Sequence, residues 1–260
     1  MRRRIVRELD TVEVAREKLE AQALELHRSN AELEQFAYVA SHDLQEPLRK
    51  IASFCQALER RYHGQLDERA DQYIEFAVDG AKRMQILIND LLAFSRVGRS
   101  GREHELVDLN DALGKAESSV SDVLEETDAT VLSETLPTVH GERTLLESLL
   151  QNLISNALKF RGSEPPAVRF TVARDDDEWL FSCSDNGIGI DPSQAERIFV
   201  IFQRLHTKEA YPGTGIGLAV CRKIVEYHGG RIWLDEHHSP GAEFRFTLPI
   251  AKEDEPSTRS

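Results

Sequence analysis

Two asparagines and a lysine on one predicted helix have the types and spacing that most directly suggest chemistry. Asn152, Asn156 and Lys159 occupy positions i, i+4 and i+7 of the segment 145–160, so they share one stripe of a helix. Two carboxamides on one stripe suit Mg²⁺, a hard ion that takes oxygen ligands and keeps several of its waters. Taken alone, a pair of hydrogen-bonded surface asparagines is the simpler interpretation. The case for a cation site therefore depends on the segments that follow.

The first of these segments is a glycine-containing turn after a predicted strand. Asp185 ends the strand, and Asn186, Gly187 and Gly189 form a sharp turn after it. A carboxylate at this place can accept a hydrogen bond from the exocyclic amine of adenine. The glycines remove side chains where the base would lie against the backbone. On its own, such a segment indicates only a turn.

A second glycine-rich segment, 213–217, immediately precedes a predicted helix. Helix N-termini offer free N–H groups and partial positive charge, so phosphates bind there. The segment is not a Walker A loop, because no Gly-Lys-Ser/Thr sequence closes it, and it is not a Rossmann fingerprint at a first strand. The order of asparagine helix, aspartate turn and second glycine segment predicts a site for ATP with Mg²⁺. We expect this site to include Asn152, Asn156, Lys159, Asp185 and the two glycines that follow it, Gly187 and Gly189. The other expected members are Phe160, Gly213, Thr214, Gly215, Gly217 and Leu218.

A polar loop is expected between the two glycine segments. The apolar stretch 199–202, with a phenylalanine at each end, is expected to anchor the polar stretch 203–212. Such a loop can close over a bound nucleotide as a lid. Arg204, His206 and Lys208 could contact phosphates there, although ordinary solvated charges fit the sequence equally well.

A histidine on an earlier predicted helix could accept a phosphoryl group. In the heptad register of the N-terminal segment, His42 falls at position f and faces solvent, where a mobile domain could reach it. Asp43 beside it could act as a general base. The heptad predicts a parallel coiled coil and a homodimer, with a single amphipathic helix lying on a partner as the alternative. The residues that define the repeat are Ile5, Val12, Leu19, Leu26, Leu33 and Ala40.

Composition narrows the class of protein. The chain has 260 residues, 40% of them hydrophobic, which is enough for about two packed domains. A net charge of −13 argues against nucleic-acid binding. No apolar run long enough for a signal peptide or transmembrane segment is present. Three widely spaced cysteines fit a reducing, cytoplasmic setting and are expected to be buried apolar residues: Cys55, Cys183 and Cys221.

Two kinds of domain would position these residues. A helix running to about residue 62, a break at 63–67 and a second helix to about residue 95 predict a helical hairpin, and two hairpins make a four-helix bundle. Intermixed strands and helices after the linker predict an α/β sandwich. We expect helices at 109–126, 142–160, 192–198 and 217–228, and strands at 107–109, 130–132, 138–140, 167–173, 179–184, 231–235 and 242–248. The expected divisions are a coiled-coil helix at 1–35, the hairpin domain at 36–98, a linker at 99–106, the α/β domain at 107–250 and a flexible tail at 251–260.

With these motifs placed, the chain resembles a sensor histidine kinase of two-component systems. The segments 36–48 and 202–206 resemble most closely the kinase modules of bacterial phytochromes. The resemblance implies a dimerisation and histidine-phosphotransfer domain, followed by a catalytic domain of the fold shared with gyrase and chaperone ATPases. It implies His42 as phosphoacceptor and Asn156 as the main Mg²⁺ ligand. It also implies that Asn152 and Lys159 assist at the phosphates and that Asp185 reads adenine.

The same resemblance implies an activity and partners. An ATP-dependent kinase of this kind phosphorylates its own histidine and passes the group to an aspartate on a response-regulator receiver domain, under the control of an upstream sensor. Glu46 departs from the Thr or Asn usual four residues after the histidine in kinases that also dephosphorylate the regulator. The alternatives are a phosphatase-dominant sensor, a conformational ATPase like the mismatch-repair proteins, and a nucleotide-switched scaffold. The conformational ATPases carry a glutamate where this chain has Asn152.

Overall fold

The computed structural model describes residues 22, 25, 43–98, 104–205, 211 and 213–250. The chain divides into two compact units, Met1–Ser95 and Arg96–Ser260. Gln22 and Glu25, both helical, are the described residues of the predicted coiled coil. The histidines at 42 and 206 and the predicted tail lie outside the described residues.

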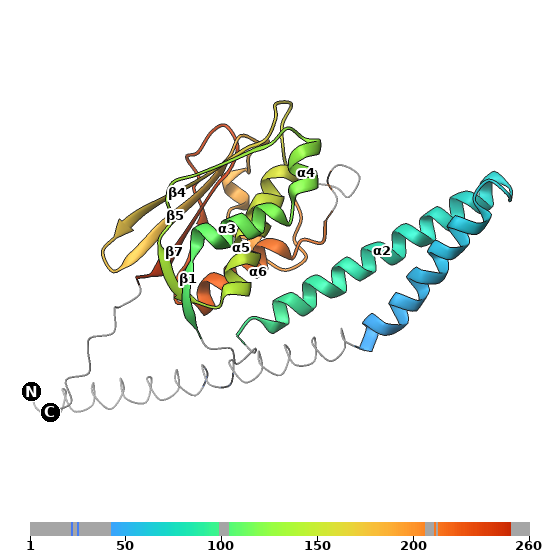
Figure 1. Cartoon of the computed structure of the whole chain (residues 1–260), viewed down its shortest axis with the longest axis horizontal. Coiled ribbons are helices and arrows are strands. Elements are labelled where there is room, and N and C mark those ends of the chain that lie inside the picture. Colours follow the sequence, from blue (N-terminus) through green and yellow to red (C-terminus); the bar gives the residue numbers. More distant parts are fainter. Residues whose placement is uncertain are drawn as a thin grey trace, which may run out of the picture. The chain divides into compact units, whose positions relative to one another are not determined.

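The first unit contains a helical hairpin (Figure 1). Residues 43–62 are helical, and α2 follows at Glu68–Arg96. The turn between them uses Gly64 at a positive φ of 72°, a conformation that favours glycine. Asp67 begins the second helix by accepting a hydrogen bond from the backbone N–H of Ala70 at 2.8 Å, as expected for a capping residue.

The hairpin buries only a narrow seam of apolar side chains. Leu48, Val78, Ala81 and Leu92 are buried within it. Large apolar side chains on both helices are nevertheless exposed in the single chain. These exposed side chains are Leu44, Ile51, Phe54, Leu58, Tyr73, Phe76, Met84 and Ile86.

The second unit is built on a five-stranded mixed sheet of order β2-β4-β5-β7-β6. Only the β2–β4 pair is parallel. A separate antiparallel pair joins β1 and β3. The strands are β1 Glu105–Asp108, β2 Thr130–Ser133, β3 Thr138–Gly141, β4 Ala167–Asp175, β5 Glu178–Asp185, β6 Ile232–Leu234 and β7 Glu243–Pro249.

Helices cover one face of this sheet (Figure 1). They are α3 Leu109–Ser118, α4 Ser121–Glu126, α5 Arg143–Lys159 and α6 Gly217–Tyr227. Alternating strand residues such as Phe170, Phe181 and Phe246 are buried in the core together with the apolar face of α5. The intervening residues of β5 and β7 point to the opposite face. The unit is therefore the α/β sandwich that the sequence predicts.

Two predicted helices differ from the observed elements. The segment 109–126 is broken into α3 and α4, because the Ser118 and Ser119 hydroxyls donate to carbonyls one turn back and Val120 leaves the helical conformation. The segment 192–198 forms two short 3-10 turns, η1 Pro192–Gln194 and η2 Arg197–Phe199. The other predicted elements are present, with ends that differ by a residue or two.

Across the described part of the chain, no helix combines the length and the apolar character that a membrane crossing requires.

Candidate nucleotide-binding site

The asparagine stripe lies on α5, whose opposite face is anchored in the core. Leu149 and Leu153 are buried, so the helix presents Asn152, Asn156 and Lys159 in a half-buried position. Asn152 donates to the Ser148 carbonyl at 2.8 Å, which fixes its carboxamide along the helix. Its Oδ1 is directed toward Gly217 at the start of α6. A Cβ added at that glycine would lie 2.8 Å from this oxygen.

Asn156 carries a buried polar atom with no partner among the described residues. Its Nδ2 is enclosed and makes no hydrogen bond. An unpaired buried amide group costs about 1–3 kcal/mol, and native proteins rarely leave one without a function. Rotation of the carboxamide can present either its N–H groups to a phosphate or its oxygen to a cation. The arrangement fits a bound group at this position.

The second glycine segment packs directly against the α5 stripe. A Cβ at Gly213 would collide with Nζ of Lys159, and one at Gly215 would lie 2.7 Å from the Gln203 carbonyl. Gly213 and Gly215 also have positive φ values, 146° and 77°. Conformation therefore requires glycine at both positions, and the backbone of Gln203 leaves no space for a side chain at Gly215.

Backbone donors are available where this segment enters α6. Ile216, at the N-cap, provides no side-chain hydrogen bond to the first turn. The first N–H groups of the helix, from Gly217 and Leu218 onward, therefore have no side-chain cap from Ile216. Thr214 accepts a hydrogen bond from the Ile216 N–H at 3.3 Å, which orders the approach to the helix. A helix start of this kind can bind phosphate oxygens.

Lys159 and Arg204 create a local positive potential beside these glycines. Burial lowers the pKa of Lys159, and the charge of Arg204 lowers it further. The Lys159 ammonium lies 4.4 Å from the Phe160 ring centroid, and the Phe160 ring packs on Tyr211 at 5.1 Å. Arg204 in turn donates to the Tyr211 carbonyl at 2.6 Å. Two cations held this close favour a polyanionic ligand between them.

Asp185 ends β5 with its carboxylate held by two backbone donors. Oδ1 accepts from the Gly187 N–H at 2.8 Å and from the Ala242 N–H at 3.0 Å, so Oδ2 faces away from these donors. Burial raises the pKa of Asp185, while the two donors and the charge of His238 oppose that effect. This environment suits a carboxylate that accepts one further hydrogen bond from a ligand.

The turn after Asp185 is tied to the end of α5. The Ile188 N–H donates to the Phe160 carbonyl at 3.0 Å, and a Cβ at Gly187 would collide with that same oxygen. A pocket of about 360 Å³ opens beside this turn. It is lined by Gly189, Ile190, Asp191, Gln194, Arg197, Arg204 and Leu205.

The structure thus brings together residues that are distant in sequence. Lys159 lies against Gly213, Asn152 against Gly217, and the Phe160 carbonyl against Gly187. Gly189 and Arg204 line the same pocket. Asp43, in the other unit, is exposed on the helix 43–62.

Some details of the site differ from the sequence expectation. Of the two phenylalanines expected to anchor the lid, Phe199 is buried, whereas Phe202 is 59% exposed. Phe202 has a φ of 65° and donates its N–H to the Gly215 carbonyl, so its backbone, not its ring, joins the site. No sequence motif marks Tyr211, Ala242 or His238 as part of the site. The turn signal at Ser239-Pro240-Gly241 marks the loop that carries the last two, but it does not indicate what the loop contacts.

Two family models match the chain in the order of its two units. Residues 32–100 match the His Kinase A (phospho-acceptor) domain. Residues 141–252 match the histidine kinase-, DNA gyrase B-, and HSP90-like ATPase family. A phospho-acceptor hairpin followed by an ATPase-type sandwich is the arrangement of a histidine kinase, and the chain belongs to the histidine kinases.

Similar proteins include phytochromes and a protein of known structure that was solved with AMPPNP. Cyanobacterial phytochrome A of Nostoc is 52% identical over 88% of this chain, and Phytochrome-like protein Cph1 of Synechocystis is 45% identical over 90%. The chain spans 30% and 31% of the lengths of these two relatives. The solved structure of full-length ShkA in complex with AMPPNP matches 84% of this chain and 46% of its own, with 27% identity and a TM-score of 0.65.

Proposed function

We propose that this chain is an ATP-dependent protein-histidine kinase that phosphorylates His42 and passes the group to an aspartate of a response-regulator receiver domain. The observation that carries the proposal is the meeting of α5 and the start of α6. There, the unpaired Nδ2 of Asn156, the Lys159 ammonium and the uncapped first N–H groups of α6 accompany glycines that leave room for a phosphate chain.

Each residue of the site would have a distinct part in binding. Asn156 and Asn152 would hold Mg²⁺, which would supply charge neutralisation on the phosphates. Lys159 and the α6 N-terminus would orient the phosphate oxygens, and Asp185 would accept a hydrogen bond from the adenine amine. Arg204, on the loop that lines the pocket, would contact the phosphates from the other side. Such a site accelerates phosphoryl transfer mainly by positioning and charge stabilisation.

The transfer itself would be an in-line displacement. A ring nitrogen of neutral His42 forms a bond to the γ-phosphorus as the bond to the β–γ bridging oxygen breaks. ADP leaves with that electron pair. Asp43 takes or shares the proton on the other ring nitrogen. In the second step the phosphoryl group moves from the histidine nitrogen to a carboxylate oxygen of the receiver domain.

The exposed apolar side chains of the hairpin support a second copy of this chain as partner. Phe54 and Phe76 are 72% and 66% exposed in the single chain. Side chains of this size are normally covered in a folded protein, and a four-helix bundle of two hairpins would cover them. We therefore include a homodimer in the proposal.

A labelling experiment tests the proposed acceptor. The full chain is incubated with MgATP carrying a labelled γ-phosphate, and the wild type is expected to gain acid-labile, alkali-stable label. His42→Ala should abolish the label. His63→Ala is a matched control, because His63 is exposed in the hairpin turn of the same unit. Label that survives in His42→Ala, or that resists acid, would contradict the proposal.

A further inference from the structure

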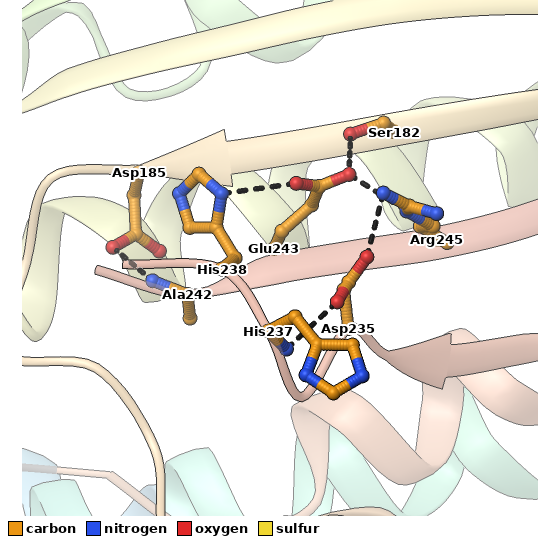
Figure 2. A network of polar contacts seen from close by, with 8 residues as sticks. All are labelled: Ser182, Asp185, Asp235, His237, His238, Ala242, Glu243 and Arg245. Carbon is orange, nitrogen blue, oxygen red and sulfur yellow. Dashed lines mark hydrogen bonds and ion pairs between the residues drawn. The ribbon is translucent and has the colours of Figure 1, made fainter. Parts of the chain in front are cut away.

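One loop beside the nucleotide site carries a charged network that the proposed function does not use. Residues 235–242 join β6 to β7, and Figure 2 shows the His238 ring of this loop between the side chains of Asp185 and Glu243. His238 Nδ1 lies 3.0 Å from Glu243 Oε2. The two side chains are 26% and 13% exposed, so solvent screens this contact less than it would an exposed ion pair.

Glu243 is itself held from two sides. Its Oε1 accepts hydrogen bonds from the Ser182 hydroxyl on β5 and from Arg245 Nε on β7, both at 2.8 Å. Arg245 also bonds Asp235 Oδ2 at 2.6 Å, and Asp235 Oδ1 accepts from the His237 N–H at 2.8 Å. The network therefore spans both strands and both ends of the loop (Figure 2). Such a chain of contacts fixes the position of His238.

The same loop is fastened to Asp185 through its backbone. The Asp185 N–H donates to the Ala242 carbonyl at 2.9 Å, and the Ala242 N–H returns a bond to Asp185 Oδ1. Gly241 lies so close that a Cβ there would collide with the Asp185 carbonyl. Movement of the loop would consequently move the Asp185 carboxylate. His238, which this loop carries, interacts electrostatically with the same carboxylate.

We propose that His238 is a positioning residue for nucleotide recognition: anchored by Glu243, its ring lies beside Asp185 and holds that carboxylate correctly turned to accept the adenine amine. This inference rests on the proposed function, because it assigns a supporting residue to the same adenine contact. In this scheme His238 acts on the nucleotide through Asp185 and does not contact the transferred phosphate.

Electrostatics agree with the geometry. Burial raises the pKa of Asp185, and the charge of His238 lowers it. The charged groups gathered around the His238 ring are Asp185 on β5, Glu243 and Arg245 on β7, and Asp235 after β6. Glu243 has a pKa below its ordinary value because the Arg245 and Ser182 hydrogen bonds and the nearby charges outweigh burial. It therefore remains an anionic anchor for His238.

The test compares His238→Gln with the wild type by calorimetric titration of the full chain with ADP and with IDP, which lacks the exocyclic amine. At neutral pH we expect the ADP dissociation constant to rise about tenfold, as one charge-assisted hydrogen bond weakens. IDP binding should change little, so discrimination between the two nucleotides falls. As the pH decreases, Asp185 protonates and the ADP contact is lost; without His238 this loss should begin at a higher pH. A purely structural role would not shift that pH profile.

Two further variants and one control complete the design. His238→Arg places a cation that can pair with Glu243 at the same position and should restore both base discrimination and the pH profile. Glu243→Gln removes the anchor and should shift ADP binding in the same direction as His238→Gln. His237→Gln is the matched control, because His237 is exposed and enters the network only through its backbone N–H.

The outcomes separate this inference from the function on which it rests. Wild-type protein that binds neither ADP nor ATP overturns the proposed function. Wild-type protein that binds ADP, with His238→Gln matching it in base discrimination and pH profile, overturns the inference alone. If His238→Gln fails to fold, His238→Arg and Glu243→Gln decide: equal ADP binding in wild type and Glu243→Gln would count against the anchoring role.

Discussion

The hairpin unit and the sandwich unit differ in how completely each covers its own apolar surface. The sandwich buries entire side chains such as Phe170, Phe181 and Phe246 between its sheet and its helices. The hairpin leaves aromatic side chains on both of its helices exposed, Phe54 and Phe76 among them. The sandwich has a complete core of its own, whereas the hairpin exposes apolar surface that a second hairpin would cover.

The charged and polar groups of the two units also differ in their surroundings. In the sandwich, Asn156 keeps a buried amide unpaired, and Lys159 is held beside Arg204 against charge repulsion. In the hairpin, Asp71 Oδ1 is also buried without a partner in the part of the chain that the structure describes, but Asp71 Oδ2 accepts from the Gly64 N–H at 2.9 Å. The ion pairs Glu46–Lys50 and Asp79–Arg83 are exposed and contribute little to stability. The sandwich has locally unfavourable interactions at the place where we propose that it binds its ligand. The hairpin instead exposes apolar side chains that are not covered within the single chain. This contrast predicts that binding and assembly can be disrupted separately.

The largest expected effect comes from Asn156→Ala. Removal of the proposed Mg²⁺ ligand should slow histidine phosphorylation by about a hundredfold to a thousandfold, the range seen when one preorganised electrostatic contact is lost. Because the variant also removes an unpaired buried polar group, thermal unfolding without nucleotide should occur at the same or a higher temperature. Both quantities are measured on the full chain, by labelling and by calorimetry.

The control for this variant is Gln151→Ala, which shortens a half-buried side chain on α5 next to the stripe. It should leave the labelling rate near that of the wild type. If Asn156→Ala is phosphorylated as fast as the wild type, α5 does not hold the cation and the assignment of the stripe is wrong.

A smaller effect is expected in the hairpin from Phe54→Asp. Ile51, Phe54 and Leu58 share one exposed face of the helix 43–62, spaced at i, i+3 and i+7. A charge in the middle of this face should raise the dimer dissociation constant at least about tenfold, given ~1.5–3 kcal/mol for burying one large apolar side chain. Sedimentation equilibrium measures this change, and ADP affinity should stay unchanged because the sandwich core is complete without the hairpin.

Ser53→Asp provides the matched comparison, because it adds the same charge at an exposed position on a different face of the same helix. It should sediment as the wild type does. Equal dissociation constants for Phe54→Asp and the wild type would show that a surface other than this apolar face holds two copies together.

Local periodicity explains why much of the architecture could be predicted from sequence. The strands β4, β5 and β7 alternate buried and outward-facing residues, and α5 carries polar residues at helical spacing, so both patterns are visible in the chain. The short 3-10 turns at 192–199 and the break after α3 were not predicted. They depend on capping and hydroxyl contacts of single residues, which periodicity does not report.

The site was predictable where its residues lie in sequence motifs and unpredictable where it depends on strand pairing. Ala242 reaches Asp185 across 57 residues of sequence because β5 pairs with β7 in one particular register. The position of His238 beside Asp185 depends on the same strand pairing. No local pattern encodes that register, so the support around Asp185 became visible only in the folded chain. The roles of the site residues themselves remain predictions that the variants above test.

The smallest effect is a pH dependence that belongs to the sandwich alone. His228 is buried, its Nε2 accepts a hydrogen bond from the Glu142 N–H at 3.0 Å, and its Nδ1 lies 2.7 Å from the Ile224 carbonyl, to which it donates. Protonation of Nε2 would remove its acceptor lone pair and leave its new N–H facing the Glu142 N–H. Burial lowers the pKa of His228, helped by the charge of His104 and opposed by the Ile224 hydrogen bond and by Glu142.

For an imidazole with a lowered folded-state pKa, the unfolded chain binds more protons at mildly acidic pH. Its contribution to stability is therefore complete above the ordinary value of 6.5 and is lost as the pH falls below it. The slope from this one group is at most about 1.4 kcal/mol per pH unit. Denaturant unfolding of the full chain between neutral and mildly acidic pH should show a shallower loss of stability for His228→Gln than for the wild type. His140→Gln, at an exposed position on β3, should retain the wild-type slope. Identical slopes for His228→Gln and the wild type would mean that the buried imidazole does not titrate on unfolding. The acid sensitivity of the sandwich would then have to originate in carboxylates whose pKa is lowered by folding, with Glu243 the first to examine.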